Sequence, residues 1–343
     1  MQSRQRSVPL TFDLVSHSPL VSVVTPVYNG ESTLPHCINS VLAQTHQNWD
    51  LTIVNNCSTD GTLEIARAFA ARDSRIRIHN VETFVRVARS YNNAVRQISP
   101  ESIYCKVLAA DDWLAPECIQ KMVELAERHP SVAVIGAYGM NGRRIGWQGL
   151  PYPTEVVQGS EMLRTRLLDG PYVFGTPSSV LYRSDVVRNR NPFYNESNFH
   201  FDSEVCFQIL ENHDFGFIHQ ILTFQGEQED SLTSFSKSVQ TYLPWVLLEL
   251  VKYGPRHLNQ SELKNRIESH LAKYYAYLGE QVFNHRDAKF WTYHEGQLAS
   301  LGYPLSKSRL ARAAASHAFR STSRAIAKAA LRPWRRDFPP SSS

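Results

Sequence analysis

Two acidic residues stand side by side in this chain, Asp111 and Asp112, directly after the apolar run at residues 104–108. Two carboxylates this close repel each other and resist being desolvated together. A hard divalent cation that carries a phosphorylated ligand would remove that conflict. In a plainer interpretation, one of the two aspartates caps the helix expected from Pro116 onward. The segment alone leaves both interpretations open.

The strands and helices expected around Asp111 and Asp112 help to decide between a cation site and a helix cap. Short, mostly β-branched apolar runs, typical of strands buried on both faces, alternate with helical patterns. The expected strands are 21–26, 49–54, 76–78 and 104–108, and the expected helices are 34–42, 62–71, 89–98 and 116–128. This alternation predicts a mostly parallel sheet with helices on both faces.

Ligands of such sheets bind beyond the carboxyl ends of the strands. Three polar turns follow expected strands, and they contain Tyr28, the pair Asn55 and Asn56, and the acidic pair. We expect these turns to meet on one rim. Their convergence favours a ligand site over a helix cap for Asp111 and Asp112.

The second half of the chain changes character at Ser236. Before it we expect strands at 132–136 and 215–223, a short helix at 159–168, and a helix at 201–210 with Asp202 and Glu204 in its first turn. After it the patterns are helical only. These patterns predict a flexible N-terminus at 1–18, a catalytic domain at 19–234, a helical extension at 235–305 and an Ala-rich basic tail at 306–343.

Composition indicates a globular protein with a real core, since 42% of its 343 residues are hydrophobic. The five cysteines show no CxxC spacing, which predicts reduced thiols, a cytoplasmic setting, and neither a zinc site nor a disulfide framework. Residues 1–18 lack the apolar core of a signal peptide. No apolar run approaches the roughly 18 residues that span a bilayer.

The net charge of +4 is unevenly distributed. From residue 305 onward there are nine Lys or Arg residues and one acidic residue, Asp337, whereas the rest of the chain is mildly acidic. The tail is either a solvated helix or a peripheral contact with the inner face of the cytoplasmic membrane, and nucleic-acid binding is not expected. In the membrane interpretation the interfacial residues are Phe319, Ile326, Leu331 and Trp334.

Three segments in order, 23–29, 57–62 and 110–116, resemble the family 2 glycosyltransferases. The resemblance covers about residues 22–234. It implies the GT-A type of α/β fold, with a mixed, mostly parallel sheet flanked by helices, here followed by a C-terminal helical extension. It also implies an inverting, hexosyltransferase-type enzyme that uses a nucleotide-sugar donor, most simply a UDP-sugar.

The same resemblance implies roles for individual residues. Asp112 would ligate Mg or Mn, and Asp111 would face the ribose or the metal's water shell. Asp202 would be the general base, with Glu204 as the fallback on the acceptor side, because residues two apart on a helix point about 200° apart. The implied donor-binding residues are Pro26, Val27, Tyr28, Asn55, Asn56, Arg89, Asn92, Ala110 and Asp111. Thr176 and Ser178 are implied on the acceptor side.

Two departures from the family pattern matter. Asn55 and Asn56 stand where the family usually has at least one Asp, which leaves the base preference open. Residues 225–230 are acidic and without a cation, where the family often has Arg or His, so that diphosphate neutralisation would fall more heavily on the metal.

We therefore expect transfer of a hexose-type sugar to a glycan, lipid-linked or polysaccharide acceptor. One alternative is a non-catalytic relative that binds a nucleotide sugar or a glycan without turnover. Another is a metal-dependent nucleotidyltransferase, although the chain lacks a Gly- and Arg-rich phosphate loop after its first strand.

Overall fold

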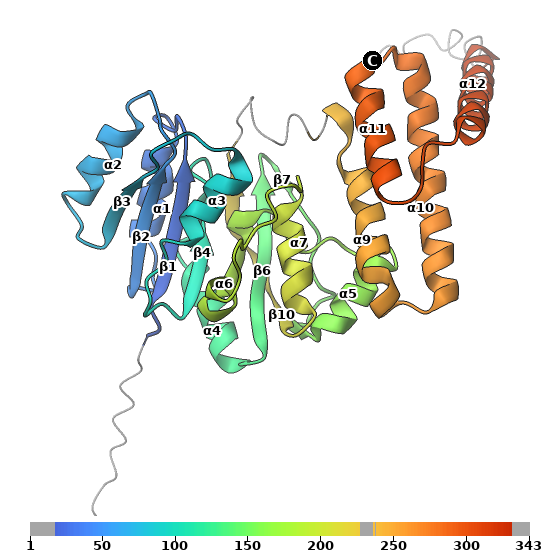
Figure 1. Cartoon of the computed structure of the whole chain (residues 1–343). Coiled ribbons are helices and arrows are strands. Elements are labelled where there is room, and N and C mark those ends of the chain that lie inside the picture. The colour runs from blue at the N-terminus through green and yellow to red at the C-terminus, as the bar shows by residue number, and fades with distance from the viewer. Residues whose placement is uncertain (1–17, 227–235, 237, 331–343) are drawn as a thin grey trace, which may run out of the picture. The chain divides into compact units, whose positions relative to one another are not determined.

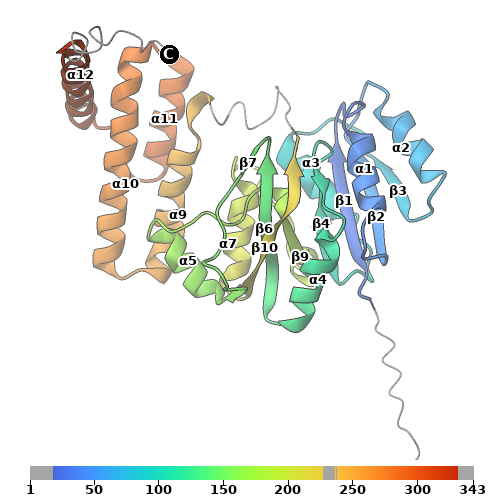
Figure 2. The same ribbon diagram turned by 180° about the vertical axis from the view of Figure 1, so that it is seen from behind.

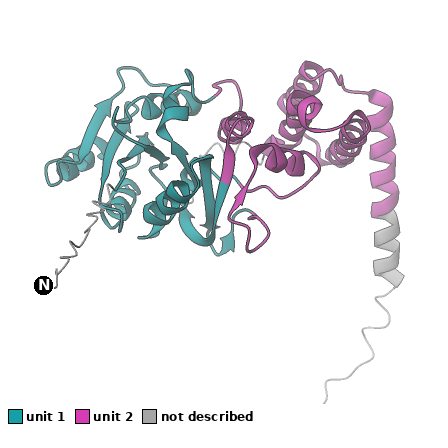
Figure 3. Cartoon of the chain, turned by 90° about the horizontal axis from the view of Figure 1, so that it is seen from below, with its two compact units in different colours: residues 1–147, 174–194, 216–226 teal, residues 148–173, 195–215, 227–343 magenta. Residues whose placement is uncertain are grey.

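The structure is a computed structural model, and it describes residues 18–226, 236 and 238–330, without the side chains of 322–330. Residues 1–17 of the expected flexible N-terminus, the acidic segment at 227–230, and Leu331 and Trp334 of the tail lie outside this range. Ile326 is described only in its backbone. The chain divides into two compact units (Figure 3). Unit 1 comprises residues 1–147, 174–194 and 216–226, and unit 2 comprises residues 148–173, 195–215 and 227–343.

Unit 1 contains a mixed sheet with the strand order β3-β2-β1-β4-β9-β6-β10-β5 (Figures 1 and 2). The strands β1 (Val21–Val27), β2 (Trp49–Asn55), β3 (Ile76–Asn80) and β4 (Tyr104–Val107) are mutually parallel, as their sequence patterns predict. The strand β9 (Val180–Arg183) runs antiparallel to β4 and to β6 (Val132–Asn141). β10 (Asp214–Gln225) begins in unit 2 and pairs antiparallel with the two-residue β5 (Trp113–Leu114). β7 (Arg144–Ile145) extends β6 as a short hairpin.

Helices cover both faces of this sheet. α3 (Val87–Val95) lies on the face toward the viewer in Figure 1, whereas α1 (Leu34–Leu42) and α4 (Cys118–Arg128) lie on the face seen in Figure 2. Every residue of β1 is buried, in agreement with its nearly all-apolar sequence. The remaining helical elements of unit 1 are α2 (Thr62–Ala70), η1 (Pro177–Ser179) and α6 (Ser184–Arg188).

Unit 2 is mainly helical. Its elements are β8 (Val156–Val157), α5 (Gly159–Leu167), α7 (Phe201–Leu210), α9 (Tyr242–His257), α10 (Gln260–Gln281), η2 (Val282–Asn284), α11 (Ala288–Ser300) and α12 (Lys307–Ala330). α10 begins with a capping box between Asn259 and Glu262. Leu247, Leu271, Tyr274, Leu278, Phe290 and Leu298 form the core that joins α9, α10 and α11. Within the described range, no helix is both long and apolar enough to cross a membrane.

Candidate active site

The turns after β1 and β2 meet at one rim of the sheet in unit 1, as the strand pattern predicts. Val27 pairs with Asn55 in the parallel register, and the backbone N–H of Asn56 donates to the Val27 carbonyl at 2.8 Å. The following residues, Tyr28 and Cys57, therefore leave the sheet side by side. This places two of the three sequence motifs next to each other.

Hydrogen bonds join the two loops beyond this point. The N–H of Asn29 donates to Ser58 Oγ at 3.0 Å, and the N–H of Thr59 donates to Asn29 Oδ1 at 2.8 Å. The N–H of Gly30 donates to Thr62 Oγ1 at 2.8 Å. Asn29 adopts a left-handed conformation with φ of 50°, which asparagine tolerates better than most residues. The loops are thus held in one shape before any ligand arrives.

Asn56 holds a third segment at this rim. Its Nδ2 donates to the Val85 carbonyl at 2.8 Å, and its Oδ1 accepts from the Val85 N–H at 3.0 Å. An aspartate could accept from the N–H but could not donate to the carbonyl. Asn55 is engaged in a similar way, since its Nδ2 donates to Asn80 Oδ1 at 3.1 Å. The departure from Asp at these positions therefore has a structural use.

The loop held by Asn56 carries an aromatic residue that the sequence did not single out. Phe84 is 54% exposed, and its ring centroid lies 4.8 Å from that of Tyr28, which is 48% exposed. An exposed pair of rings offers an apolar surface on which a planar ring can stack. The available signal in the sequence was a lone phenylalanine in a polar loop, which is too weak to recognise.

The acidic pair lies between β4 and β5 in the same unit. The cap interpretation is wrong, because α4 begins at Cys118, its N-cap is Glu117, and no side chain caps it. Asp112 is only 6% exposed, and its Oδ1 accepts from the Gly226 N–H at 3.2 Å. Asp111 is half-buried. The chain therefore holds a buried carboxylate beside a half-buried one for a reason other than capping.

Electrostatics at the pair are unfavourable to a double negative charge. Burial, and next the charge of Asp111, raise the pKa of Asp112 to about 7, although hydrogen bonds from Ser178 and Gly226 act against this shift. Burial also raises the pKa of Asp111. A cation bound to these oxygens would favour both ionised forms. The pair therefore suits a positive ligand.

A buried lysine of β4 places a positive charge close enough to influence Asp112. Lys106 of β4 has no exposed surface, and its Nζ donates to the Val180 carbonyl at 3.2 Å. Burial lowers the pKa of this ammonium group. Its field opposes the rise in the pKa of Asp112 but does not cancel it. The sequence pattern gave no sign of it, because Lys106 stands inside an otherwise apolar strand.

The donor set fits a hard cation such as Mg²⁺ or Mn²⁺, which prefers carboxylate and phosphate oxygens. Asp111 and Asp112 would hold it. Across residues 18–226, 236 and 238–330, no group of three or more His, Cys, Asp or Glu side chains is arranged to hold an ion.

Ser178 and Thr176 lie at the turn of η1 in unit 1. Ser178 is buried, and its hydroxyl accepts from the Ala109 N–H at 3.0 Å and donates to Asp112. Thr176 forms a reciprocal cap with Ser179. Ser178 thus supports Asp112 through a hydrogen bond. A direct contact of Ser178 or Thr176 with the acceptor stays a prediction.

Gly226 packs directly against the acidic pair. A Cβ added at this position would lie 2.1 Å from the carbonyl oxygen of Asp111. We expect Gly226→Ala to shift the backbone there and to lower the free energy of unfolding by about 1–3 kcal/mol, measured by thermal or urea unfolding. Gly296→Ala is the control, because nothing lies within 4 Å of a Cβ at that helical position. A control that loses as much stability as Gly226→Ala would contradict this account.

The two predicted donor-loop residues of α3 lie in different surroundings. Asn92 is buried, its Nδ2 donates to the Tyr194 carbonyl at 2.9 Å, and its Oδ1 accepts from the Tyr194 N–H at 2.8 Å. Arg89 is exposed. Asn92 therefore fixes the segment that contains Tyr194, and Arg89 is the more accessible of the two. Ala110 is buried beside the acidic pair.

Asp202 and Glu204 belong to unit 2, in the first turn of α7. Burial raises the pKa of Asp202 to about 6. Burial also acts to raise the pKa of Glu204, but hydrogen bonds from Lys252, Asn198 and Asn195 hold it below its usual value. Glu204 is thus a tightly paired carboxylate, and Asp202 is the one with a pKa suited to exchanging a proton near neutral pH.

Comparison with known proteins identifies the family of the domain that holds the acidic pair. Residues 22–190 match the family described as Glycosyl transferase family 2, so this part of the chain is a family 2 glycosyltransferase domain. A putative glycosyltransferase of Bacillus subtilis, EpsE, is 33% identical over 154 residues, which are 43% of this chain and 54% of EpsE. The putative teichuronic acid biosynthesis glycosyltransferase TuaG of the same organism is 33% identical over 111 residues, which are 32% of this chain and 43% of TuaG. The chain thus spans about half of these relatives or less.

Solved structures share the fold. S. aureus TarS 1–349 in complex with UDP-GlcNAc superposes with a TM-score of 0.61 at 15% identity, covering 82% of this chain and 80% of that one. The mannosyltransferase PcManGT from Pyrobaculum calidifontis, in complex with GDP-Man and Mn²⁺, superposes with a TM-score of 0.53 at 14% identity, covering 93% and 88%. These likenesses confirm the GT-A fold class, with its helical C-terminal region.

Proposed function

We propose that this chain is an inverting glycosyltransferase of the hexosyltransferase type. It transfers a sugar from a nucleotide-diphosphate donor, most simply a UDP-sugar, to a hydroxyl of a glycan, lipid-linked or polysaccharide acceptor. The observation that carries the proposal is the buried acidic pair at the end of β4, on the sheet that also carries the joined loops of β1 and β2. The nucleotide sugars bound by TarS and PcManGT support the donor class.

The donor side of the reaction falls to unit 1. The proposed donor contacts are Pro26, Val27, Tyr28, Asn55, Asn56, Arg89, Asn92, Ala110 and Asp111. Asp111 and Asp112 would hold Mg²⁺ or Mn²⁺, which when bound would stabilise the negative charge that develops on the leaving nucleoside diphosphate. The Mn²⁺ in the PcManGT structure supports this choice of ion.

The acceptor side requires a base. In the proposed reaction Asp202 takes the proton from the acceptor hydroxyl as its oxygen attacks the anomeric carbon, the bond from that carbon to the diphosphate oxygen breaks, and the configuration inverts. The pKa of about 6 favours this role, because the carboxylate is ionised at neutral pH yet basic enough to accept a proton. Glu204, Thr176 and Ser178 stay the proposed residues on the acceptor side.

The setting of the reaction is also part of the proposal. We place it in the cytoplasm, on the catalytic domain at 19–234, with the helical extension and the basic tail after it. A lipid-linked acceptor would suit a peripheral contact between the tail and the cytoplasmic membrane. The second candidate, a non-catalytic relative that binds the donor only, is motivated by the replacement of Asp by Asn55 and Asn56.

A donor screen separates the two candidates. The full chain is incubated with a panel of nucleotide sugars with Mn²⁺, Mg²⁺ or EDTA, and release of nucleoside diphosphate is measured alongside binding. The proposal predicts metal-dependent release from one donor or a few. Binding without hydrolysis or transfer for every donor would favour the non-catalytic relative.

The two hydrogen bonds between the Asn56 side chain and the backbone of Val85 give a second test of the donor side. Asn56→Asp removes the donor to the Val85 carbonyl and sets two oxygens against each other, so we expect the donor Kd to rise about tenfold while kcat changes less. Calorimetric titration with the nucleoside diphosphate measures this effect. Asn259→Asp is the matched control, because Asn259 caps α10 through its side-chain oxygen, a role that aspartate keeps. An unchanged Kd in Asn56→Asp would show that these two hydrogen bonds do not contribute to donor binding.

A further inference from the structure

Helix α12 has an unusual charge pattern. Its sequence contains six Lys or Arg residues and neither Asp nor Glu. Four of the cations, Lys307, Arg309, Arg312 and Arg320, lie in the part whose side chains are described, and all four are exposed. A solvated helix usually mixes both signs of charge. The pattern therefore indicates an anionic partner.

One face of α12 is already occupied by α10. A Cβ added at Gly279 of α10 would lie 2.6 Å from the carbonyl carbon of Ala313, so the two backbones approach closely. Leu310 and Ala313 pack against the core of unit 2, and His317 stacks on Phe283 with centroids 5.6 Å apart. These contacts fix which side of α12 faces outward.

The outward side carries an exposed aromatic ring. Phe319 is 76% exposed. At 100° per residue it shares this side with Ala311, Arg312 and Ala315, all of which are exposed. A line of small and apolar residues beside cations is the arrangement of helices that lie in a lipid–water interface.

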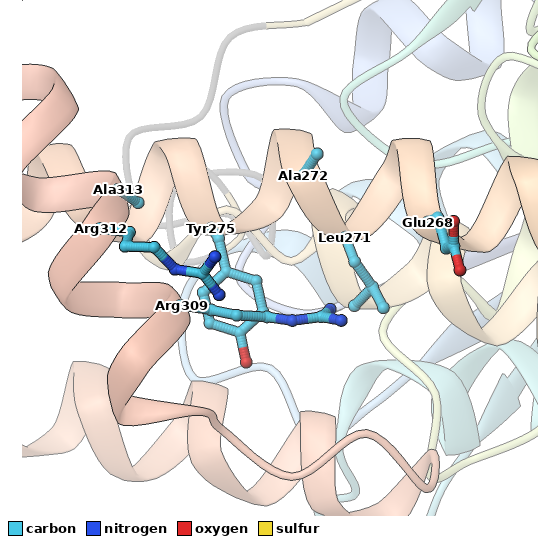
Figure 4. Close-up of a pocket in the computed structure, with 7 residues that line it drawn as sticks. All are labelled: Glu268, Leu271, Ala272, Tyr275, Arg309, Arg312 and Ala313. Atoms are coloured by element: carbon cyan, nitrogen blue, oxygen red, sulfur yellow. The ribbon is translucent and has the colours of Figure 1, made fainter.

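A hollow of about 490 Å³ lies next to the cations, between α10 and α12 (Figure 4). Leu271 and Tyr275 of α10 line it, and the side chains of Arg309 and Arg312 extend over it from α12, with Glu268 of α10 farther along the same helix. In the described parts of the chain, neither arginine forms an ion pair with a carboxylate, and the guanidinium of Arg309 lies 6.0 Å from the ring centroid of Tyr275. The Nε of Arg312 donates to the Ser308 carbonyl at 3.4 Å, which leaves its terminal nitrogens available. Two guanidinium groups without a carboxylate partner beside an open hollow suit a phosphate group.

We propose that α12 docks on an anionic phospholipid surface, with a lipid phosphate held between Arg309 and Arg312 at this hollow and Phe319 in the interface. This lipid site gives the membrane contact of the proposed function a definite place on the chain. The lipid site rests on that proposed contact and not on sugar transfer. Phe319 favours a lipid surface over a nucleic-acid duplex, because an apolar phase that can take up the ring lies behind the phosphates of a lipid surface but not behind those of a duplex.

Vesicle flotation of the full chain tests the proposal. We expect binding to phosphatidylcholine vesicles that contain phosphatidylglycerol, weakened by salt, and little binding to phosphatidylcholine alone. The double variant R309Q/R312Q should bind about 25-fold more weakly, at about fivefold for each cation lost. Phe319→Ser should also weaken binding. Glu268→Gln should strengthen it, because this change removes the carboxylate that lines the hollow.

The matched control is R67Q/R72Q, which removes two exposed cations of the α2 region in unit 1. It should leave vesicle binding unchanged. Equal losses in both double variants would reduce the effect to net charge and overturn the proposed site, as would equal binding to neutral and anionic vesicles. Thermal unfolding checks that R309Q/R312Q is folded. Donor turnover without vesicles should be unchanged in that variant, so failure of the lipid site and failure of the transferase proposal are told apart.

Discussion

Replacing Asp202 by asparagine is expected to lower kcat by about 10²–10⁴-fold while the Kd of the donor stays close to that of the unaltered chain. The amide keeps the size of the side chain but cannot accept the proton of the acceptor hydroxyl. Donor binding should persist because the proposed donor contacts belong to other residues. Steady-state kinetics and calorimetric titration on the same preparation give the two quantities.

The pH profile of kcat provides an independent check on Asp202. Burial raises its pKa to about 6, so the carboxyl group is protonated and inactive as a base below that pH, and kcat should rise as the pH increases through about 6. A profile without this ionisation, or an Asp202→Asn variant with an unaltered kcat, would contradict the assignment.

Glu204→Gln is the comparison variant for Asp202. Glu204 accepts hydrogen bonds from Asn195 and Asn198, both at 2.8 Å, and pairs with Lys252. Loss of the buried charge-assisted contacts should lower the free energy of unfolding by about 1–3 kcal/mol. It should not reproduce the pH-dependent loss of kcat. If it did, the roles of the two carboxylates would be reversed.

The second large effect concerns the acidic pair. Asp111→Asn and Asp112→Asn should each weaken Mn²⁺-dependent binding of the nucleoside diphosphate by at least the roughly 10–100-fold that the loss of a supporting residue costs a metal site. The amide keeps one oxygen but removes the charge that attracts the ion. Titrations in Mn²⁺ and in EDTA separate the metal-dependent part of the affinity.

Asp50→Asn is the matched control for this effect. Asp50 lies near the start of β2, at the opposite end of the parallel strands from the acidic pair, and pairs with Arg77. Its substitution should leave metal-dependent binding unchanged. Equal affinity in Mn²⁺ and EDTA for the unaltered chain would show that the pair does not hold the ion with the nucleotide.

Much of unit 1 is predictable from local sequence. The strands at residues 21, 49, 76 and 104 begin at the expected residues. β1 and β2 are dense runs of mostly β-branched and apolar side chains, whereas β3 shows only an alternation of Ile76 and Ile78 with polar residues. The meeting of the Tyr28 and Asn56 turns follows from parallel pairing alone. The two-residue β5 and the hairpin strand β7 were not predicted, since runs of two residues carry no periodicity.

The parts of the site that sequence did not predict depend on contacts between distant residues. Asn56 meets Val85 through a loop 29 residues away, and Ser178 meets Ala109 across 69 residues. In the sequence, Lys106 only interrupts an apolar strand pattern. Its burial and its influence on Asp112 become visible only in the structure. Side-chain pairing of this kind is set by tertiary packing, which no periodicity in one segment encodes.

The division of the chain shows the same limit. Residues 148–173 and 195–215 pack with the C-terminal helices in unit 2, although they precede Ser236, where the pattern of the sequence changes. A periodic pattern reports which face of a helix is buried but not which partner buries it. The catalytic domain at 19–234 stays a prediction about function, distinct from this division by compactness.

The most direct test of the central claim is the release of nucleoside diphosphate from a nucleotide-sugar panel by the full chain and by its Asp111→Asn, Asp112→Asn and Asp202→Asn variants. We expect metal-dependent release from at least one donor by the unaltered chain. We expect loss of both binding and release in the first two variants, and loss of release with retained binding in the third. Release that persists in EDTA, or that survives all three substitutions, would contradict the central claim.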